Sequence, residues 1–188
     1  GKEAAEALLH REGISDVRVE YVAGNLTDHY DPRSKVLRLS DATYQQTSVA
    51  AIGVAAHECG HAIQHARGYA PLSIRSAIVP VANFGSSIAW PLIIIGLIMN
   101  SQTSQLFLNL GVIAFSMAVL FQIVTLPVEF NASRRALKIL GNTGMLYPDE
   151  VRETRKVLTA AALTYVAGAA SAILQLLRLI MISNYRRD

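Results

Sequence analysis

The chain has 188 residues and a formal net charge of +3, with 52% hydrophobic and only 16% charged residues. This composition is apolar for a soluble protein, and the apolar residues concentrate after residue 77, whereas residues 1–47 have the composition of an ordinary soluble segment. The basic residues flank apolar segments and form no stripe with interleaved aromatic side chains, which argues against nucleic-acid binding and indicates a membrane surface.

Residues 1–47 predict one helix and two strands. Residues 2–12 carry apolar side chains at helical spacing, and Gly13 ends the pattern. Residues 17–21 and 36–39 alternate between polar and apolar side chains, which predicts a small β-hairpin around a loop at residues 25–33. The second strand comes just before the next helix, so its free edge could pair with an extended substrate backbone, although a plain structural hairpin explains the same pattern.

Four polar residues follow one another within the predicted loop: Asp28, His29, Tyr30 and Asp31. Such a cluster can supply a hydrogen-bond acceptor to a metal-ligating histidine or a donor to a transition state. More often, Asx hydrogen bonds hold a cluster of this kind as a turn, and we expect that role for each residue taken singly.

The next helix carries His-Glu-x-x-His at residues 57–61. Because His57 and His61 are four residues apart, their imidazoles lie on one face of the helix and can both hold Zn²⁺. Glu58 lies close enough on the helix to reach a metal-bound water, whose proton a carboxylate can accept. This arrangement is typical of a metal-dependent peptide hydrolase.

The context of the motif supports this interpretation over a helix with two surface histidines and an unrelated glutamate. The flanking residues from 50 to 63 are small or apolar, so the polar side chains would be costly to bury unless they are used. Thr47 or Ser48 can cap the helix, and Gly68 can end it. Cys59, the single cysteine, lies away from the metal face and is expected to be a packing residue.

Two uncharged runs follow, at residues 78–99 and 106–128, with a short polar loop at residues 100–105. Each run is long enough to cross a hydrocarbon layer of about 30 Å, so together they predict a transmembrane hairpin. Pro80 and Pro91 should kink the first span. A buried core hairpin is the alternative, but the chain has too little other sequence to surround both helices.

Beyond the hairpin, residues 129–140 predict a basic amphipathic helix that Gly141 and Gly144 break. Pro148 begins another helix, which continues into a third membrane span at residues 160–182. The predicted chain is therefore a mainly α membrane protein with a zincin-like helix and a small β-hairpin. It divides into a metallopeptidase part (1–75), a transmembrane hairpin (78–128), helices carrying a third ligand (129–158) and a third transmembrane helix (160–182).

The distribution of basic residues predicts the orientation in the membrane. Two arginines, Arg186 and Arg187, lie on the side opposite to the metal helix, and the hairpin loop there has none. The metal-helix side carries more of them: Arg67, Arg75, Arg134, Arg135, Lys138, Arg152, Arg155 and Lys156. Since cytoplasmic loops are enriched in Lys and Arg, we expect a multi-pass plasma-membrane protein with a cytoplasmic active site.

Catalytic zinc usually has three protein ligands, and Glu129 is the predicted third. It is the first acidic residue after residue 58, and the hairpin returns it to the side that the chain left. Otherwise, Glu129 would only mark the water boundary of the span. Ser133 lies four residues later on the same helix face and can hydrogen-bond a ligand, whereas His65 is either a fourth ligand or a histidine at the helix end.

Several segments resemble the YugP-type bacterial membrane zinc metallopeptidases. They are LTDHYDP at 26–32, VAAHECGHAIQH at 54–65, APL at 70–72, VPVANFG at 79–85, LPVEFNASRRA at 126–136 and AAALTYV at 160–166. The layout is also similar to the HtpX-type membrane proteases, in which a transmembrane hairpin separates His-Glu-x-x-His from a glutamate ligand. The resemblance implies a zinc metalloendopeptidase of a bacterial plasma membrane. It also implies an N-terminal membrane helix before Gly1 in the full-length protein.

The predicted function is zinc-dependent peptide hydrolysis, with one Zn²⁺ per chain and Glu58 as general base. Candidate donors to the transition state are His29, Tyr30, Tyr147 and Tyr165. The expected partners are a peptide or membrane-protein substrate and the lipid bilayer, with no nucleic acid, and an oligomer or accessory membrane partner is compatible with the sequence. The alternative is a membrane scaffold or partner-binding protein whose metal site is structural or degenerate, and such a site would need four protein ligands.

Overall fold

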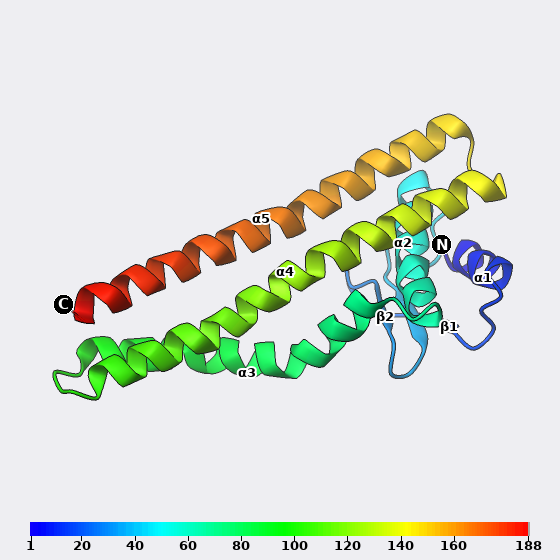
Figure 1. The fold of residues 1–188 in the computed structure, drawn as a ribbon. Coiled ribbons are helices and arrows are strands. Elements are labelled where there is room, and N and C mark those ends of the chain that lie inside the picture. Colours follow the sequence, from blue (N-terminus) through cyan, green and yellow to red (C-terminus); the bar gives the residue numbers. More distant parts are fainter. Residues whose placement is uncertain (188) are drawn as a thin grey trace. The chain divides into compact units, whose positions relative to one another are not determined.

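The computed structural model describes residues 1–187 and has a mainly helical chain with one small sheet (Figure 1), which confirms the predicted fold class. Two compact units are present: unit 1 comprises residues 1–72 and 127–163, and unit 2 comprises residues 73–126 and the chain from residue 164. The elements in chain order are α1 (Lys2–Arg11), β1 (Arg18–Tyr21), β2 (His29–Asp31), β3 (Val36–Leu39), α2 (Val49–Ala66), α3 (Ala70–Ile98), α4 (Ser104–Thr143) and α5 (Pro148–Arg187).

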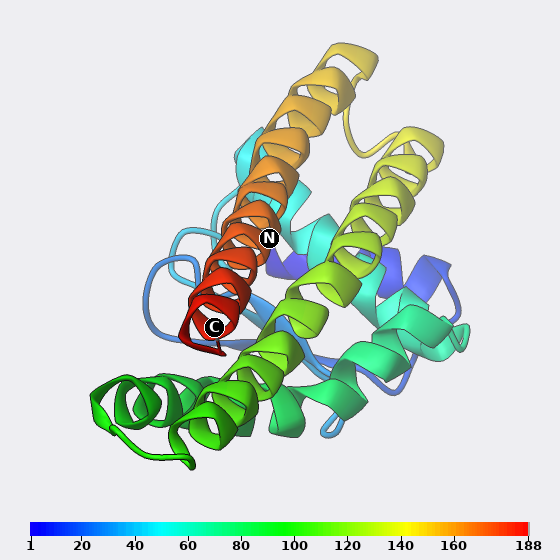
Figure 2. The same cartoon turned by 60° about the vertical axis from the view of Figure 1, so that its left-hand side comes forward.

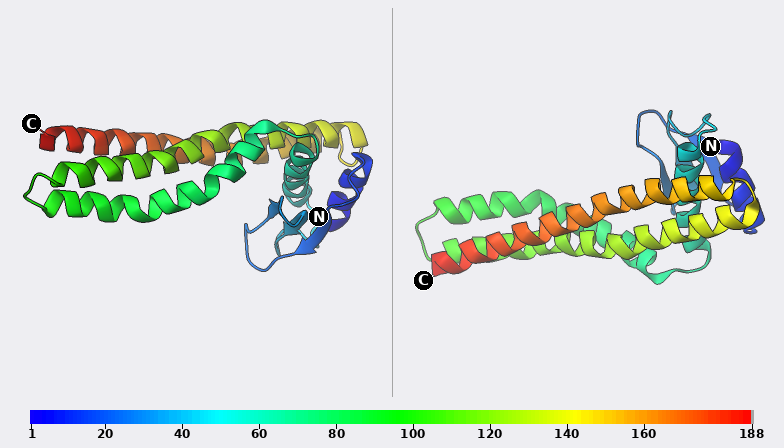
Figure 3. Two further views of the ribbon diagram at one scale, coloured as in Figure 1. Left: turned by 60° about the horizontal axis from the view of Figure 1, so that its bottom comes forward. Right: turned by 90° about the horizontal axis from the view of Figure 1, so that it is seen from above.

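The sheet of unit 1 has three strands in the order β1-β3-β2, with β1 parallel and β2 antiparallel to β3 (Figure 3). The expected loop at residues 25–33 therefore contains a strand, and the hairpin consists of β2 and β3. The predicted free edge at residues 36–39 is wrong, because β3 is central and its backbone is paired on both sides. The free edges of the sheet belong to β1 and β2, and a substrate backbone could add only there.

Helix α2 lies in the core of unit 1 and begins and ends as predicted. The Ser48 hydroxyl accepts a hydrogen bond from the backbone N–H of Ala51 at 3.1 Å, and Gly68 adopts a φ of 68° just after the helix. Gly60 permits a close approach to α4, because a Cβ there would lie 2.4 Å from the carbonyl oxygen of Ala132. This contact brings the face of α2 that carries the histidine pair against the start of the unit 1 part of α4.

The unit 1 parts of α4 and α5 are joined by a short connection (Figure 2). The prediction that Gly141 breaks the helix is wrong: α4 continues through it to Thr143, and Gly144 follows with a φ of 67°. One glycine costs a helix about 1 kcal/mol relative to alanine, which a long packed helix tolerates. Helix α5 then begins at Pro148, where the Glu150 carboxylate accepts a hydrogen bond from the backbone N–H of Tyr147 at 2.9 Å.

Unit 2 contains most of α3, the first part of α4 and the last part of α5. Side chains from all three helices, Ile93, Leu108 and Leu179, are buried together. Helix α3 contains Pro80 and Pro91 and is visibly bent (Figure 3), in agreement with the predicted kink. Helices α3, α4 and α5 are each long and apolar enough to cross a membrane. Large apolar side chains are exposed along them, as expected for lipid contact.

Candidate metal centre

Two helices of unit 1 bring three potential metal ligands together. The Nε2 atom of His57 lies 2.8 Å from one carboxylate oxygen of Glu129, and the Nε2 atom of His61 lies 3.5 Å from the other. The two imidazole rings stand nearly perpendicular, at 87°, with their centroids 4.8 Å apart. Helix α2 thus supplies two nitrogen donors and α4 supplies one carboxylate at a single point.

The arrangement of these donors fits zinc. Ligands that bind a tetrahedral zinc at about 2.0–2.1 Å lie roughly 3.3–3.4 Å from one another, and the two distances to Glu129 lie on either side of this value. Two histidines and one glutamate are also a common protein ligand set for catalytic zinc. His61 and Glu129 are each only 5% exposed, so the centre lies at the edge of the core and not on an open surface.

A hydroxyl and an amide contact the other nitrogen of each imidazole. Nδ1 of His57 lies 2.9 Å from Oγ of Ser133, the contact expected from the spacing of Ser133 and Glu129. Nδ1 of His61 donates to Oε1 of Gln64 at 3.0 Å. Partners at Nδ1 fix the ring orientation and leave Nε2 directed at the metal position.

Glu58 follows His57 on α2 and does not belong to the ligand cluster. Its side chain is 8% exposed and is absent from the cluster of His57, His61 and Glu129. Among residues 1–187, no side-chain hydrogen bond or ion pair involves the Glu58 carboxylate. Every fully buried side-chain oxygen of the described residues has a hydrogen-bond partner, so the oxygens of Glu58 are not fully buried. The Glu58 oxygens therefore remain available to a water molecule.

Tyr30 and His65, two further predicted residues, pair with each other. The hydroxyl of Tyr30 lies 2.7 Å from Nδ1 of His65, and the two rings are in contact. Burial, followed by the negative charges of Asp16 and Asp31, raises the pKa of Tyr30 to about 12, so this hydroxyl stays protonated beside His65. In the described part of the chain, His65 does not join the ligand cluster.

The polar cluster at residues 28–31 differs from the expected turn, because His29–Asp31 form strand β2 and the turn follows at residues 32–35. The Asp28 carboxylate accepts hydrogen bonds from the backbone N–H and the hydroxyl of Ser40. His29 is exposed, and its Nδ1 donates to the carbonyl oxygen of Thr27 at 2.8 Å. Asp31 accepts hydrogen bonds from the backbone of Arg33 and from the hydroxyl of Ser34.

Two tyrosines and the cysteine named from the sequence differ in their exposure. Tyr147 follows α4 in unit 1 and is 75% exposed, whereas Tyr165 belongs to the α5 segment of unit 2. Cys59 is fully buried, and its thiol donates to the carbonyl oxygen of Ala5 at 3.6 Å. Burial, together with the charge of Glu58, raises the pKa of the Cys59 thiol, in agreement with the predicted packing role.

Sequence reasoning missed Gln64. This side chain is completely buried, and its amide nitrogen donates to the carbonyl oxygen of Val128 at 2.8 Å and to Oδ1 of Asn131 at 3.0 Å. Its position seven residues after His57, two helical turns along the same face, is the signal that could have identified it. Gln64 and Asn131 therefore connect the two helices beside the ligand cluster.

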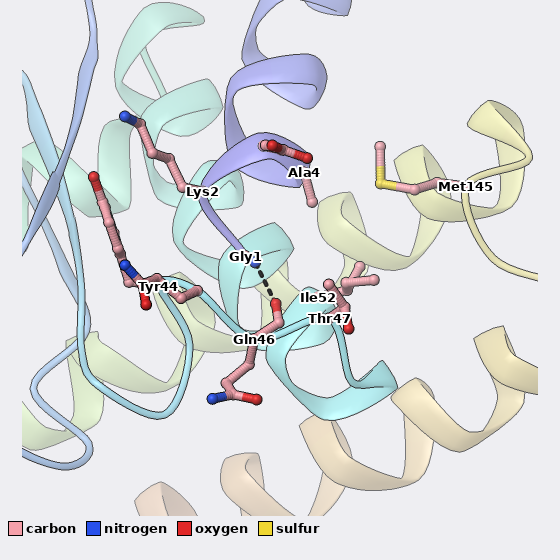
Figure 4. A pocket seen from close by; sticks show the side chains of 10 residues that line it. Gly1, Lys2, Ala4, Tyr44, Gln46, Thr47, Ile52 and Met145 are labelled. Carbon is pink, nitrogen blue, oxygen red and sulfur yellow. Dashed lines mark hydrogen bonds between the residues drawn. The ribbon is translucent and has the colours of Figure 1, made fainter.

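A separate cavity of about 680 Å³ lies near the start of α1 and is lined by Lys2, Tyr44, Gln46, Ile52 and Met145, among others (Figure 4). No residue of the ligand cluster lines this cavity. The pocket therefore contributes nothing to the chemistry of the metal centre.

Comparison with known proteins agrees with the donor set. The sequence model of a family described as "Putative neutral zinc metallopeptidase" matches residues 1–184. The chain is 48% identical to the protein named "Putative membrane protease YugP" of Bacillus subtilis (strain 168), over all of its own length and 82% of that protein. No solved structure matches the chain.

Proposed function

We propose that this chain, which belongs to the putative neutral zinc metallopeptidase family, hydrolyses peptide bonds with one zinc held by His57, His61 and Glu129. The observation that carries the proposal is the convergence of two imidazole Nε2 atoms and one carboxylate from two helices. When bound, zinc supplies a Lewis acid that polarises the peptide carbonyl and lowers the pKa of water. The donor set matches the metal named in the family description.

Glu58 is the proposed general base. Its carboxylate has no side-chain partner among the described residues and lies on the helix between the two histidines, so it can accept a proton from the attacking water. The same carboxyl group then returns this proton to the leaving nitrogen of the peptide. Ser133 and Gln64 hold the two imidazoles through their Nδ1 atoms during the reaction.

A membrane scaffold with a structural metal is the alternative function. A closed structural site needs four protein ligands, whereas the cluster found within residues 1–187 offers three. His65, the residue considered as a fourth ligand, is instead hydrogen-bonded to Tyr30. An open position on the metal is what a hydrolase requires, so these observations favour the peptidase.

The proposed setting is a bacterial plasma membrane with the active site on the cytoplasmic side. Three helices are long and apolar enough to serve as spans, and the similar Bacillus protein is named as a membrane protease. The orientation rests on the excess of arginine and lysine near the span ends on the metal-helix side. The proposed substrates are peptides or membrane proteins that reach the membrane surface.

The decisive experiment replaces Glu58 with glutamine. We expect at least a 10²–10⁴-fold loss of peptide hydrolysis with full zinc content, because a general base contributes roughly that factor and is not a ligand. Glu153→Gln is the matched control, since Glu153 is exposed and pairs with Lys156 on the surface of α5. Hydrolysis near the wild-type rate in Glu58→Gln would refute the proposed mechanism. A metal with four protein ligands and no hydrolysis in the wild type would favour the scaffold.

A further inference from the structure

We infer that Gln64 is a positioning residue that selects the nitrogen with which His61 binds the metal. The backbone carbonyl oxygen of Val128 can only accept a hydrogen bond, so the Gln64 group 2.8 Å from it is the amide nitrogen. The amide oxygen of Gln64 therefore faces Nδ1 of His61, at 3.0 Å. Since that oxygen can only accept, Nδ1 carries a proton, and Nε2 bears the lone pair of the neutral ring.

A second chain of hydrogen bonds fixes the same orientation independently. The Arg135 side chain can only donate, and its Nε lies 2.7 Å from Asn131, so the oxygen of Asn131 faces this point. The second amide hydrogen of Gln64 also goes to that oxygen. Arg135 in turn lies over the ring of Tyr69, with its guanidinium carbon 5.5 Å from the ring centroid. The Gln64 amide has no freedom to flip, and its two donors and its acceptor are all used.

The position of Gln64 explains why this interaction matters to the metal centre. Its acceptor holds a ligand of α2, and its donors hold α4 on both sides of Glu129, at Val128 and Asn131. One buried amide thus aligns His61 and the backbone that carries the carboxylate ligand. Removing a hydrogen-bond partner of a metal ligand typically lowers metal affinity roughly 10–100-fold.

The test measures zinc affinity of the full chain in detergent by competition with a chromophoric chelator. Gln64→Met preserves the volume and removes all three hydrogen bonds, and we expect zinc binding about 10–100-fold weaker. Gln64→Glu keeps an acceptor for Nδ1–H of His61 but places an oxygen opposite the acceptors of Val128 and Asn131, so it should restore only the part of the loss that comes from orienting the imidazole. Cys59→Ala, at a fully buried position of the same helix that contacts no ligand, controls for general destabilisation.

A second readout distinguishes positioning from packing. In zinc-loaded protein labelled with ¹⁵N-histidine, His61 should show a protonated Nδ1 and a metal-bound Nε2, and Gln64→Met should lose this single pattern. The inference rests on the proposed ligand set: if the wild type binds no zinc, that set fails. If the wild type binds zinc and Gln64→Met binds it as tightly, or no more weakly than Cys59→Ala, the role of Gln64 alone is overturned.

A pocket that none of the three proposed ligands lines, but that adjoins the metal centre through Ser133, carries a second inference. Between α4 and α5 in unit 1 lies a cavity of about 410 Å³ lined by Arg134, Lys138 and Arg155, with the Thr159 hydroxyl beside them and Phe130 on its apolar wall. Within residues 1–187, none of the three cations forms an ion pair or a side-chain hydrogen bond. The pocket thus gathers three uncompensated positive charges next to apolar surface.

We propose that this pocket binds the headgroup of an anionic phospholipid. Phe130 lies two residues beyond the uncharged run of α4, and by the helical rise Arg134 and Lys138 lie about 6 and 12 Å further along the helix. A headgroup layer is roughly 5–8 Å thick on each side of the hydrocarbon core, so a phosphate can lie level with Arg134. Lys138 begins beyond this layer, but its long side chain lines the same cavity, and an acyl chain would lie along exposed Phe130. A soluble anion would use the charges alone and leave this apolar surface uncovered.

The test is retention of phosphatidylglycerol by the full chain extracted from mixed phosphatidylcholine and phosphatidylglycerol vesicles, counted by native mass spectrometry. Lipid retention should weaken about 100-fold in the triple variant Arg134→Gln, Lys138→Gln, Arg155→Gln. Each cation contributes about 1 kcal/mol of attraction to an anionic lipid, and three such contributions correspond to about that factor. A control that combines Arg33→Gln, Arg152→Gln and Lys156→Gln removes the same charge from other exposed positions and should retain the lipid.

Three outcomes would overturn the lipid site. One is a wild type that retains no phosphatidylglycerol in preference to phosphatidylcholine, and another is equal loss in both triple variants. The third is displacement of the lipid by millimolar inorganic phosphate alone, which would assign the pocket to a soluble anion. The experiment needs no peptidase activity and can be done on Glu58→Gln protein. It therefore tests lipid binding whether or not the chain hydrolyses peptides.

Discussion

Replacing Glu129 with glutamine tests the ligand cluster at the residue that joins its two helices. The substitution keeps the side-chain shape and removes the negative charge, so the imidazoles lose the carboxylate whose oxygens lie 2.8 and 3.5 Å from their Nε2 atoms. We expect zinc affinity to fall by more than about 100-fold, because losing a ligand removes more than the roughly 10–100-fold that follows the loss of a ligand's hydrogen-bond partner.

This loss of affinity has a thermodynamic consequence that can be measured. A ligand that binds only the folded protein stabilises it by RT ln(1 + [L]/Kd), which is about 2.7 kcal/mol at a free concentration of about 100 Kd. If Glu129→Gln raises Kd about 100-fold, the same zinc concentration stabilises the variant by only about 0.4 kcal/mol. At roughly 2–4 °C per kcal/mol, a zinc-dependent rise in Tm of about 5–10 °C shrinks to about 1 °C.

The assay is thermal unfolding of detergent-solubilised protein that has been stripped with a chelator and then titrated with zinc. Glu153→Gln removes the same charge from an exposed surface position and should keep the full wild-type rise in Tm. If Glu129→Gln keeps that rise as well, the carboxylate is not a ligand. The proposed zinc site of His57, His61 and Glu129 would then be wrong.

Three further predictions follow from other parts of the molecule. In alkaline titration, the difference in tyrosinate absorbance between the wild type and Tyr30→Phe should have its midpoint near pH 12, and a midpoint near pH 10 would contradict this prediction. Because the pKa of Tyr30 is higher in the folded than in the unfolded protein, the stability due to neutral Tyr30 should be present below about pH 10 and lost between about pH 10 and 12. Gly60→Ala should lower unfolding free energy by about 1–3 kcal/mol and weaken zinc binding, because its Cβ would lie 2.4 Å from a carbonyl oxygen of α4; wild-type stability in denaturant titration would refute this. A cysteine at Ser101, on a Cys59→Ala background, should be labelled from outside intact cells, and labelling only after lysis would reverse the proposed orientation.

The sequence was most informative where a pattern is local. The histidine pair of α2 and its capping serine depend on spacings within one helix, and the uncharged runs need only length and composition. Glu129 could be selected because no other acidic residue lies between it and residue 58. These features need no knowledge of which elements pack together.

Features that depend on contacts between distant segments could not be predicted. Strand β2 has only three residues, too few to show an alternating pattern, and the parallel pairing of β1 with β3 is set by packing and not by a turn. Gly141 gives a helix-breaking signal that the packing of α4 overrides. Gln64 looks like an isolated polar residue until its partners on α4, 64 and 67 positions away, are known.

The burial of Cys59 makes it an internal reporter of local opening. Its sulfur contacts the backbone of α1, it is fully buried, and its raised pKa suppresses the reactive thiolate. An alkylating reagent can therefore modify this thiol only when α1 separates from α2 or the whole of unit 1 unfolds. The alkylation rate, compared with the global unfolding rate, would show how often α1 separates from α2, the helix that carries Glu58 and both histidines, in the native protein.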